Sequence, residues 1–91
     1  MNRLYVLINV KPGKVEEVAQ IVQNKPGVLF ADIIDSPPDI IMVVHASDKQ
    51  KLAELTLNAL TPAEHLIKEV QLLPAQDKKI TLATALTFRR N

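Results

Sequence analysis

The sequence predicts an α+β fold in which two β-α units are joined by a β-hairpin. Three observations lead to this prediction. First, Val28 to Val44 places two apolar runs on either side of five turn-forming residues, Asp35 to Asp39, which is the pattern of two antiparallel strands and their loop. Second, a helix-like segment lies on each side of this hairpin. Third, a strand-like segment lies at each end of the chain.

Length and composition limit the classes of protein that the chain can represent. Ninety-one residues predict one domain, 1–91, near the lower end of stable sizes. The hydrophobic fraction of 47% is high for so small a chain and indicates contact with another subunit. A net charge of +1 is too small to attract nucleic acid strongly. The absence of cysteine excludes disulfides, thiolate metal sites and a cysteine nucleophile. No segment resembles a membrane span or a signal peptide, which is typical of a cytoplasmic protein.

The first half of the chain contains two segments with clear periodicity. Leu4 to Val10 is apolar except for Asn9, and a strand that is apolar on both faces is typically central in its sheet. From Val15, apolar residues recur at i, i+3, i+4 and i+7, which predicts an amphipathic helix that ends before Asn24–Gly27.

The two strands of the hairpin follow this helix. They are predicted over residues 28 to about 34 and about 40 to 46. The second of them is again apolar on both faces, with His45 as its exception. The chain therefore contains two strands with the composition of central strands.

The second half begins with two capping patterns. Ser47–Gln50 has the Ser-x-x-Gln pattern of a capping box and predicts a helix from about Asp48 to Leu60. Thr61–Glu64 has a second capping box, with proline at the first helical position.

The segment after the second capping box has two interpretations. A strand over Leu66–Leu73 would place Lys68 on the same face as Val70 and Leu72, whereas a helical period places the apolar residues together. We therefore predict an extra helix from Pro62 to about Leu73. The last strand is then predicted over Ile80–Phe88, where large apolar residues alternate with threonine and alanine.

Right-handed crossovers of these elements produce a ferredoxin-like βαββαβ sandwich with an extra helix before the last strand. Its sheet has four antiparallel strands, helices on one face only, and the first and third strands at its centre. The open sheet face then requires a cover, for which a second copy in a two-fold dimer is the simplest choice. At about 25 cal/mol per Å², burying roughly a few hundred Å² contributes several kcal/mol, comparable with the stability of a small domain.

The first half of the sequence resembles the effector-binding domain of the Lrp/AsnC family, which is also called the RAM domain. The resemblance begins with Leu4–Lys14 and continues through the helix to Lys25-Pro26-Gly27-Val28. It reaches the hairpin, where Asp39-Ile40-Ile41 is similar to the family's Asp-Ile after a Gly-x-x-Asp turn. The second half is similar in element order only.

The resemblance implies dimers that assemble further into rings, with small effectors, typically amino acids, between the subunits. Family members that regulate transcription carry an N-terminal helix-turn-helix. Because only two residues, Asn2 and Arg3, separate Met1 from the first predicted strand, we expect a stand-alone form that does not contact DNA directly. Neither a membrane nor a cofactor is expected as a partner.

The same resemblance identifies Ser36, Asp39 and Thr84 as candidate effector-binding residues. Ser36 stands where the family turn has glycine, and Thr84 lies in the predicted last strand, where relatives carry threonines near the effector. Considered from the residues alone, Asp39 is more often a turn-capping carboxylate, and Thr84 is more often a packed threonine than a ligand group. These alternatives remain open at this point.

Three function hypotheses follow. The first is a non-enzymatic sensor or regulatory domain that binds a small metabolite. The second is a small dimeric monooxygenase of the αβ-barrel type, with Asn9 and His45 in a pocket between sheet and helices. The third is a ligand-free scaffold. His45 and His65 are too far apart in sequence to indicate a metal site, and no catalytic motif is present.

Overall fold

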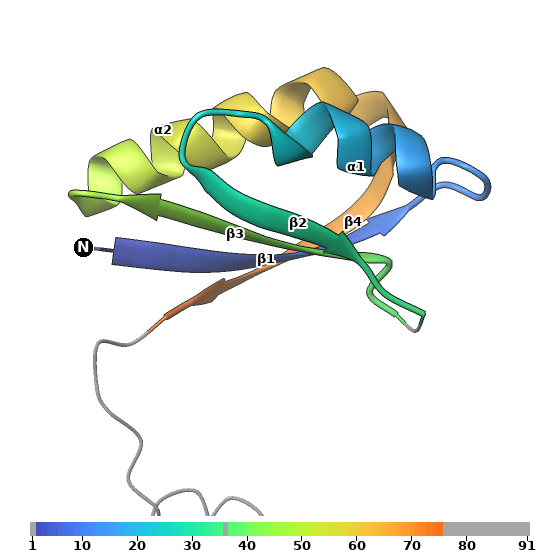
Figure 1. Cartoon of the computed structure of the whole chain (residues 1–91), viewed down its shortest axis with the longest axis horizontal. Coiled ribbons are helices and arrows are strands. Elements are labelled where there is room, and N and C mark those ends of the chain that lie inside the picture. The colour runs from blue at the N-terminus through green and yellow to red at the C-terminus, as the bar shows by residue number, and fades with distance from the viewer. Residues whose placement is uncertain (1, 36, 76–91) are drawn as a thin grey trace, which may run out of the picture.

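A computed structural model describes residues 2–35 and 37–75 of the chain. Four strands form one antiparallel sheet in the order β2-β3-β1-β4, and the helices lie on one of its faces (Figure 1). This is the predicted ferredoxin-like arrangement. The elements are β1 (Asn2–Val10), α1 (Val15–Gln23), β2 (Val28–Ile33), β3 (Ile40–Ala46), α2 (Lys49–Leu60), the 3₁₀ helix η1 (Thr61–Leu66) and β4 (Ile67–Pro74).

The two strands with continuous apolar sequence are the two central strands, as predicted. β1 and β3 pair from Asn2 opposite Ala46 to Ile8 opposite Ile40. Alternate side chains of β1 point toward the helices, and Val6 and Ile8 among them are fully buried. The period of two along a strand therefore divides β1 into one face for the core and one for the open side of the sheet.

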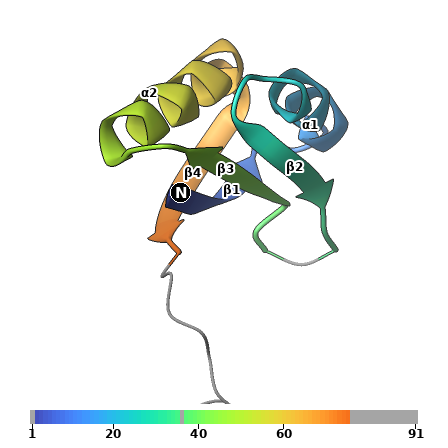
Figure 2. The same cartoon turned by 60° about the vertical axis from the view of Figure 1, so that its left-hand side comes forward.

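The helices form a single layer over the core. α1 packs mainly against β2, and α2 packs mainly against the two central strands β3 and β1 (Figure 2). The spacing of Val18, Ala19 and Val22 buries one face of α1, which confirms the predicted helix. No helix in the described part of the chain is long and apolar enough to cross a membrane.

The cap of α2 differs from the predicted one. Asp48 occupies the N-cap position, and its Oδ1 accepts a hydrogen bond from the Lys51 N–H at 2.7 Å. The prediction that Ser47 begins a capping box is wrong. Both residues are good caps, and the chain enters the helix one residue later than the Ser-x-x-Gln spacing indicates.

The extra helix predicted from Pro62 to Leu73 is wrong over most of its length. α2 continues directly into η1, which ends at Leu66, and Ile67–Pro74 is the fourth strand. Thr61 caps no new helix: its Oγ1 donates to the Leu57 carbonyl of the preceding turn at 2.7 Å. The strand predicted over Ile80–Phe88 lies outside the described residues.

A β-bulge explains why this strand resembles a helix in sequence. Val10 lies opposite Ile67 and Asn9 opposite Glu69, so Lys68 is an extra residue in β4. The bulge shifts the alternation by one position, and Val70 thereby joins Ile67 on the helix-facing side. An i, i+3 spacing that is typical of a helix is here produced by a bulged strand.

The face of the sheet opposite the helices carries a band of apolar side chains. Tyr5 and Leu7 of β1 lie opposite Val43 and Ile41 of β3 on this face. Phe30 of β2 is 44% exposed and lies opposite Val43, while Leu73 of β4 is 44% exposed and lies opposite Tyr5.

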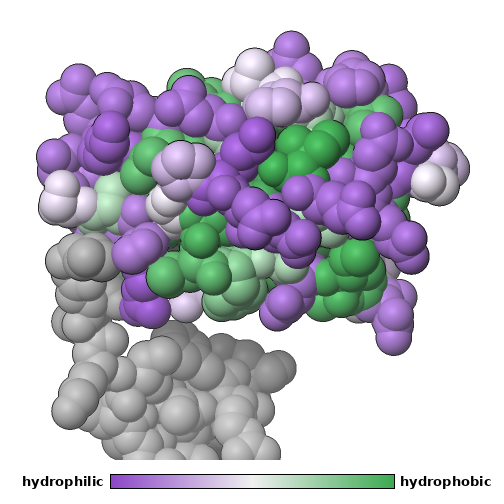
Figure 3. Space-filling view, turned by 45° about the horizontal axis from the view of Figure 1, so that its top comes forward, coloured by the Kyte–Doolittle hydropathy of each residue, from purple (hydrophilic) through white to green (hydrophobic). Residues whose placement is uncertain are grey.

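The helix side of the molecule has a different surface. It is largely hydrophilic, with hydrophobic side chains in separate patches (Figure 3). The open sheet face and the two sheet edges therefore hold most of the exposed large apolar residues, which are Leu29, Phe30, Ile33, Leu57, Leu72 and Leu73.

Candidate functional site

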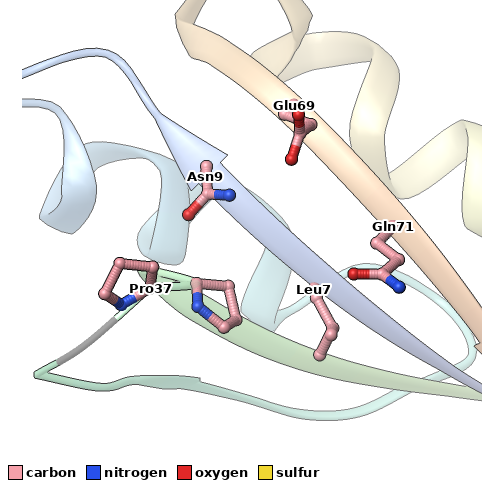
Figure 4. Close-up of a pocket in the computed structure, with 6 residues that line it drawn as sticks. Leu7, Asn9, Pro37, Glu69 and Gln71 are labelled. Carbon is pink, nitrogen blue, oxygen red and sulfur yellow. The ribbon is translucent and has the colours of Figure 1, made fainter.

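A hollow of about 200 Å³ opens on the helix-free face of the sheet, where β1 and β4 meet the β2–β3 loop (Figure 4). Two strands and the loop each contribute a pair of side chains to its wall. The lining residues are Leu7, Asn9, Pro37, Pro38, Glu69 and Gln71.

The register between β1 and β4 creates the polar part of this hollow. Leu7 lies opposite Gln71 and Asn9 opposite Glu69, so these side chains share the open face. Without the bulge, the residue opposite Asn9 would be Lys68. The extra residue in β4 therefore places a carboxylate in the hollow where a regular strand would place an ammonium group.

Asp39 anchors the loop that forms the remaining wall. Its backbone N–H donates to the Ile8 carbonyl at 2.9 Å, and its carbonyl accepts from Ile34 at 2.9 Å. Its carboxylate Oδ2 accepts a hydrogen bond from the Val10 N–H at 2.9 Å. These contacts tie the start of β3 to the end of β1 and thereby hold Pro37 and Pro38 beside the hollow.

The lining residues determine what this hollow can bind. Glu69 supplies a carboxylate, and Asn9 and Gln71 supply amide groups that both donate and accept hydrogen bonds. Leu7 and the two prolines supply apolar surface. Among the described lining residues none carries a positive charge, so the hollow suits a small ligand with an ammonium or hydroxyl donor and an apolar portion.

The structure places only one of the three sequence-predicted site residues. Asp39 follows Pro38 in the chain but does not line the hollow, and its carboxylate accepts a backbone hydrogen bond, which was the alternative interpretation from the residues alone. Ser36 and Thr84 lie outside the described residues. Their role as effector contacts stays a prediction.

Sequence reasoning missed Glu69 and Gln71 because it assigned their segment to a helix. The period-two alternation of Glu69 and Gln71 with Val70 and Leu72 was the pattern that could have identified them. Leu7 was assigned to a central strand, without a role at a site.

The monooxygenase hypothesis required Asn9 and His45 in one pocket between sheet and helices. Both residues instead lie on the open face, because they alternate with the buried residues of their strands. They are also far apart: Asn9 lies opposite Glu69 at one end of the sheet, and His45 lies opposite Arg3 at the other. The predicted arrangement of this pair is therefore wrong. Within residues 2–35 and 37–75, no cluster of three or more His, Asp or Glu residues could hold a metal ion.

Comparisons with known proteins find similarity in structure alone. No family model and no curated protein matches the chain. A solved structure from Thermus thermophilus is 19% identical with a TM-score of 0.76, covering 87% of this chain and 98% of its own. A transcriptional regulatory protein of the AsnC family from Pyrococcus furiosus is 24% identical with a TM-score of 0.63, covering 91% of this chain and 55% of its own.

A third solved structure is a transcriptional regulator from Neisseria meningitidis in complex with L-Met. It is 17% identical with a TM-score of 0.67, and the match covers 89% of this chain and 54% of the regulator. The chain therefore spans about half the length of the two regulators. At these identities the likeness concerns the fold, and at that level the resemblance to the Lrp/AsnC effector-binding domain is confirmed.

Proposed function

We propose that the chain is a non-enzymatic regulatory domain that binds a small molecule, with an amino acid as the expected class. The observation that carries the proposal is the hollow at the β1–β4 register, where one carboxylate and two amides lie beside apolar side chains. The shared fold with regulators of transcription supports it. The complex of the Neisseria regulator with L-Met supports the choice of ligand class.

An amino acid fits the chemistry of the lining residues. Its α-ammonium group would donate to the Glu69 carboxylate, and its side chain would lie against Leu7 and Pro37. Because no described lining residue is cationic, its α-carboxylate would accept hydrogen bonds from the amide N–H groups of Asn9 and Gln71. Glu69 is exposed, so its attraction for a cation is weakened by water and salt. We therefore expect the amides of Asn9 and Gln71 to supply much of the orientation of the ligand.

The domain is proposed to pair with a second copy through the open face of the sheet. The apolar band there includes Tyr5, Leu7 and Ile41, and Phe30 and Leu73 beside it are almost half exposed. A two-fold dimer would bury the same band on both copies, and the hollow would then lie at the margin of the interface. Further assembly into rings, or with DNA-binding relatives in a cytoplasmic regulatory complex, is part of the same proposal.

A thermal-shift screen against the twenty amino acids tests ligand binding. A ligand at 100 times its Kd adds about 2.7 kcal/mol to the free energy of unfolding. We expect at least one amino acid to raise Tm, and Glu69→Gln to abolish most of that shift. Glu64→Gln, an exposed glutamate on η1, is the matched control and should retain the shift. If no amino acid stabilises the protein, the ligand-free scaffold becomes the better hypothesis.

The mass in solution tests the pairing. The chain has a mass of 10.1 kDa, and light scattering should report twice that value or a higher multiple. Leu7→Glu places a charge in the apolar band and should release monomers. Leu57→Glu on α2, whose side chain is 64% exposed, should leave the oligomer intact. A stable wild-type monomer would contradict the pairing.

A further inference from the structure

The open face of the sheet carries opposite charges at its two ends. The odd-numbered residues of β1 point to this face, because they alternate with buried ones. Arg3 is exposed and lies opposite His45 at one end of the sheet. Glu69 is exposed and lies opposite Asn9 at the other end, where both line the hollow (Figure 4). The apolar band therefore separates a guanidinium group from a carboxylate.

The spacing of these two groups fits the symmetry of a face-to-face dimer. Arg3 and Asn9 are six residues apart on β1, which is roughly 20 Å at about 3.3 Å per residue. Val6 is midway between them. A two-fold axis that crosses the strands at the level of Val6 exchanges the two ends of β1, and so brings the partner's Arg3 over Asn9. Glu69 lies beside Asn9 on the neighbouring strand.

The charged ends distinguish two orientations that would both bury the apolar band. If the two-fold axis runs along the strands, both Arg3 side chains lie at one end of the interface and both Glu69 carboxylates at the other. If the axis crosses the strands, each Arg3 faces the Glu69 end of the other copy, and Tyr5 packs against the partner's Leu7. Complementary charges fix the register of an interface, and like charges brought together oppose it. The charge distribution therefore favours the axis that crosses the strands.

We propose that the partner's Arg3 completes the ligand site at the hollow. This inference rests on the dimer and the ligand class proposed above. No described lining residue is cationic, so one copy offers Glu69 to an α-ammonium group but only neutral amides to an α-carboxylate. Packed sheets lie about 10 Å apart, and the long side chain of arginine spans much of that gap. Its guanidinium group binds a carboxylate through two parallel hydrogen bonds.

A site shared in this way couples ligand binding to assembly. A ligand with both an α-ammonium and an α-carboxylate group bridges Glu69 of one copy and Arg3 of the other. An amine without the carboxylate contacts one copy only. Because coupling between two binding events is reciprocal, the amino acid strengthens the dimer to the same extent that the dimer strengthens binding of the amino acid.

Charge exchange tests the orientation without any ligand. Arg3→Glu sets a carboxylate against the partner's Glu69, and Glu69→Arg sets two guanidinium groups together. Because symmetry repeats the contact, each single variant should raise the dissociation constant of the dimer about tenfold or more, measured by analytical ultracentrifugation at low salt. Arg3→Glu combined with Glu69→Arg should return it to within about threefold of the wild type. Arg3→Glu combined with Glu64→Arg, on η1, is the matched control and should remain weak. Circular dichroism verifies that every variant folds.

A comparison of an amino acid with its decarboxylated amine tests the ligand contact. The probes are the amino acid that raises Tm most and the amine that lacks its carboxyl group, at protein concentrations above the dissociation constant of the dimer. The wild type should bind the amino acid about tenfold or more tightly than the amine. Arg3→Gln should bind the two within about threefold of each other, and the amino acid should no longer strengthen its dimer.

The outcomes separate this inference from the proposed function. A monomeric wild type, or a double variant that does not recover, would overturn the position of the partner's Arg3. An Arg3→Gln protein that still prefers the amino acid would overturn its role in binding while the ligand class stands. Recovery of the dimer by charge exchange in a protein that binds no amino acid would support the position of the partner's Arg3 and overturn the ligand class alone.

Discussion

Replacement of Asp39 by alanine should destabilise the protein because one hydrogen bond is lost. Its carboxylate accepts from the Val10 N–H at 2.9 Å in a partly buried position. Hydrogen bonds to charged groups contribute about 1.5–3 kcal/mol, and partial exposure favours the lower end. We expect Asp39→Ala to lower the free energy of unfolding by about 1.5 kcal/mol, because the Val10 N–H at the end of the β1–β3 ladder would lose its acceptor.

Urea denaturation measures this loss, and the m-value should stay unchanged because the folded surface is the same. Each kcal/mol corresponds to about 4–8 °C in Tm for a domain of this size. Asp39→Asn keeps an oxygen in the accepting position and should lose less than half as much. Asp35→Ala, in the same loop and exposed, is the control and should stay within about 0.5 kcal/mol of the wild type. Equal stabilities of Asp39→Ala and Asp35→Ala would refute the capping role.

Three further predictions concern the turn before β2, the start of α2 and the bulge in β4. Gly27→Ala should cost more stability than Gly13→Ala, although both glycines have positive φ, because a Cβ at Gly27 would lie 2.6 Å from Leu55 Cδ1 and one at Gly13 would meet nothing. The left-handed backbone alone costs about 1–2 kcal/mol at either glycine. The additional loss at Gly27 should be smaller when Gly27→Ala is made in a Leu55→Ala background, measured by thermal unfolding of the double variant against Leu55→Ala alone. Asp48→Ala should lower the free energy of unfolding by about 1 kcal/mol, because α2 loses its N-cap, whereas Ser47→Ala should change it little. Urea denaturation measures both. Deletion of Lys68 should keep the native circular dichroism spectrum, since it converts the bulge into regular pairing. Deletion of Val70 should unfold the protein, because it either sets the Glu69 carboxylate opposite the buried Ile8 or, if the bulge persists, reverses the faces of residues 71–74.

Local patterns in the sequence were sufficient to predict the helices and strands in the first half of the chain. The i, i+3, i+4, i+7 spacing in α1, the turn formers of the hairpin and the apolar character of β1 and β3 each depend on residues near in sequence. They therefore predict the same elements that the structure contains. The uncovered sheet face also followed from sequence, because two strands were apolar on both faces and the helices could cover only one.

Only the tertiary structure decided the identity of β4 and the composition of the hollow. Lys68 becomes a bulge residue through its pairing with a strand almost sixty positions earlier in the chain, and no local pattern contains that partner. The same register brings Glu69 beside Asn9. The hydrogen bonds of Asp39 hold the loop so that Pro37 and Pro38 line the same hollow. Local sequence determined the helices and strands up to the end of α2, whereas β4, its register and the site built across that register exist only once distant strands have paired.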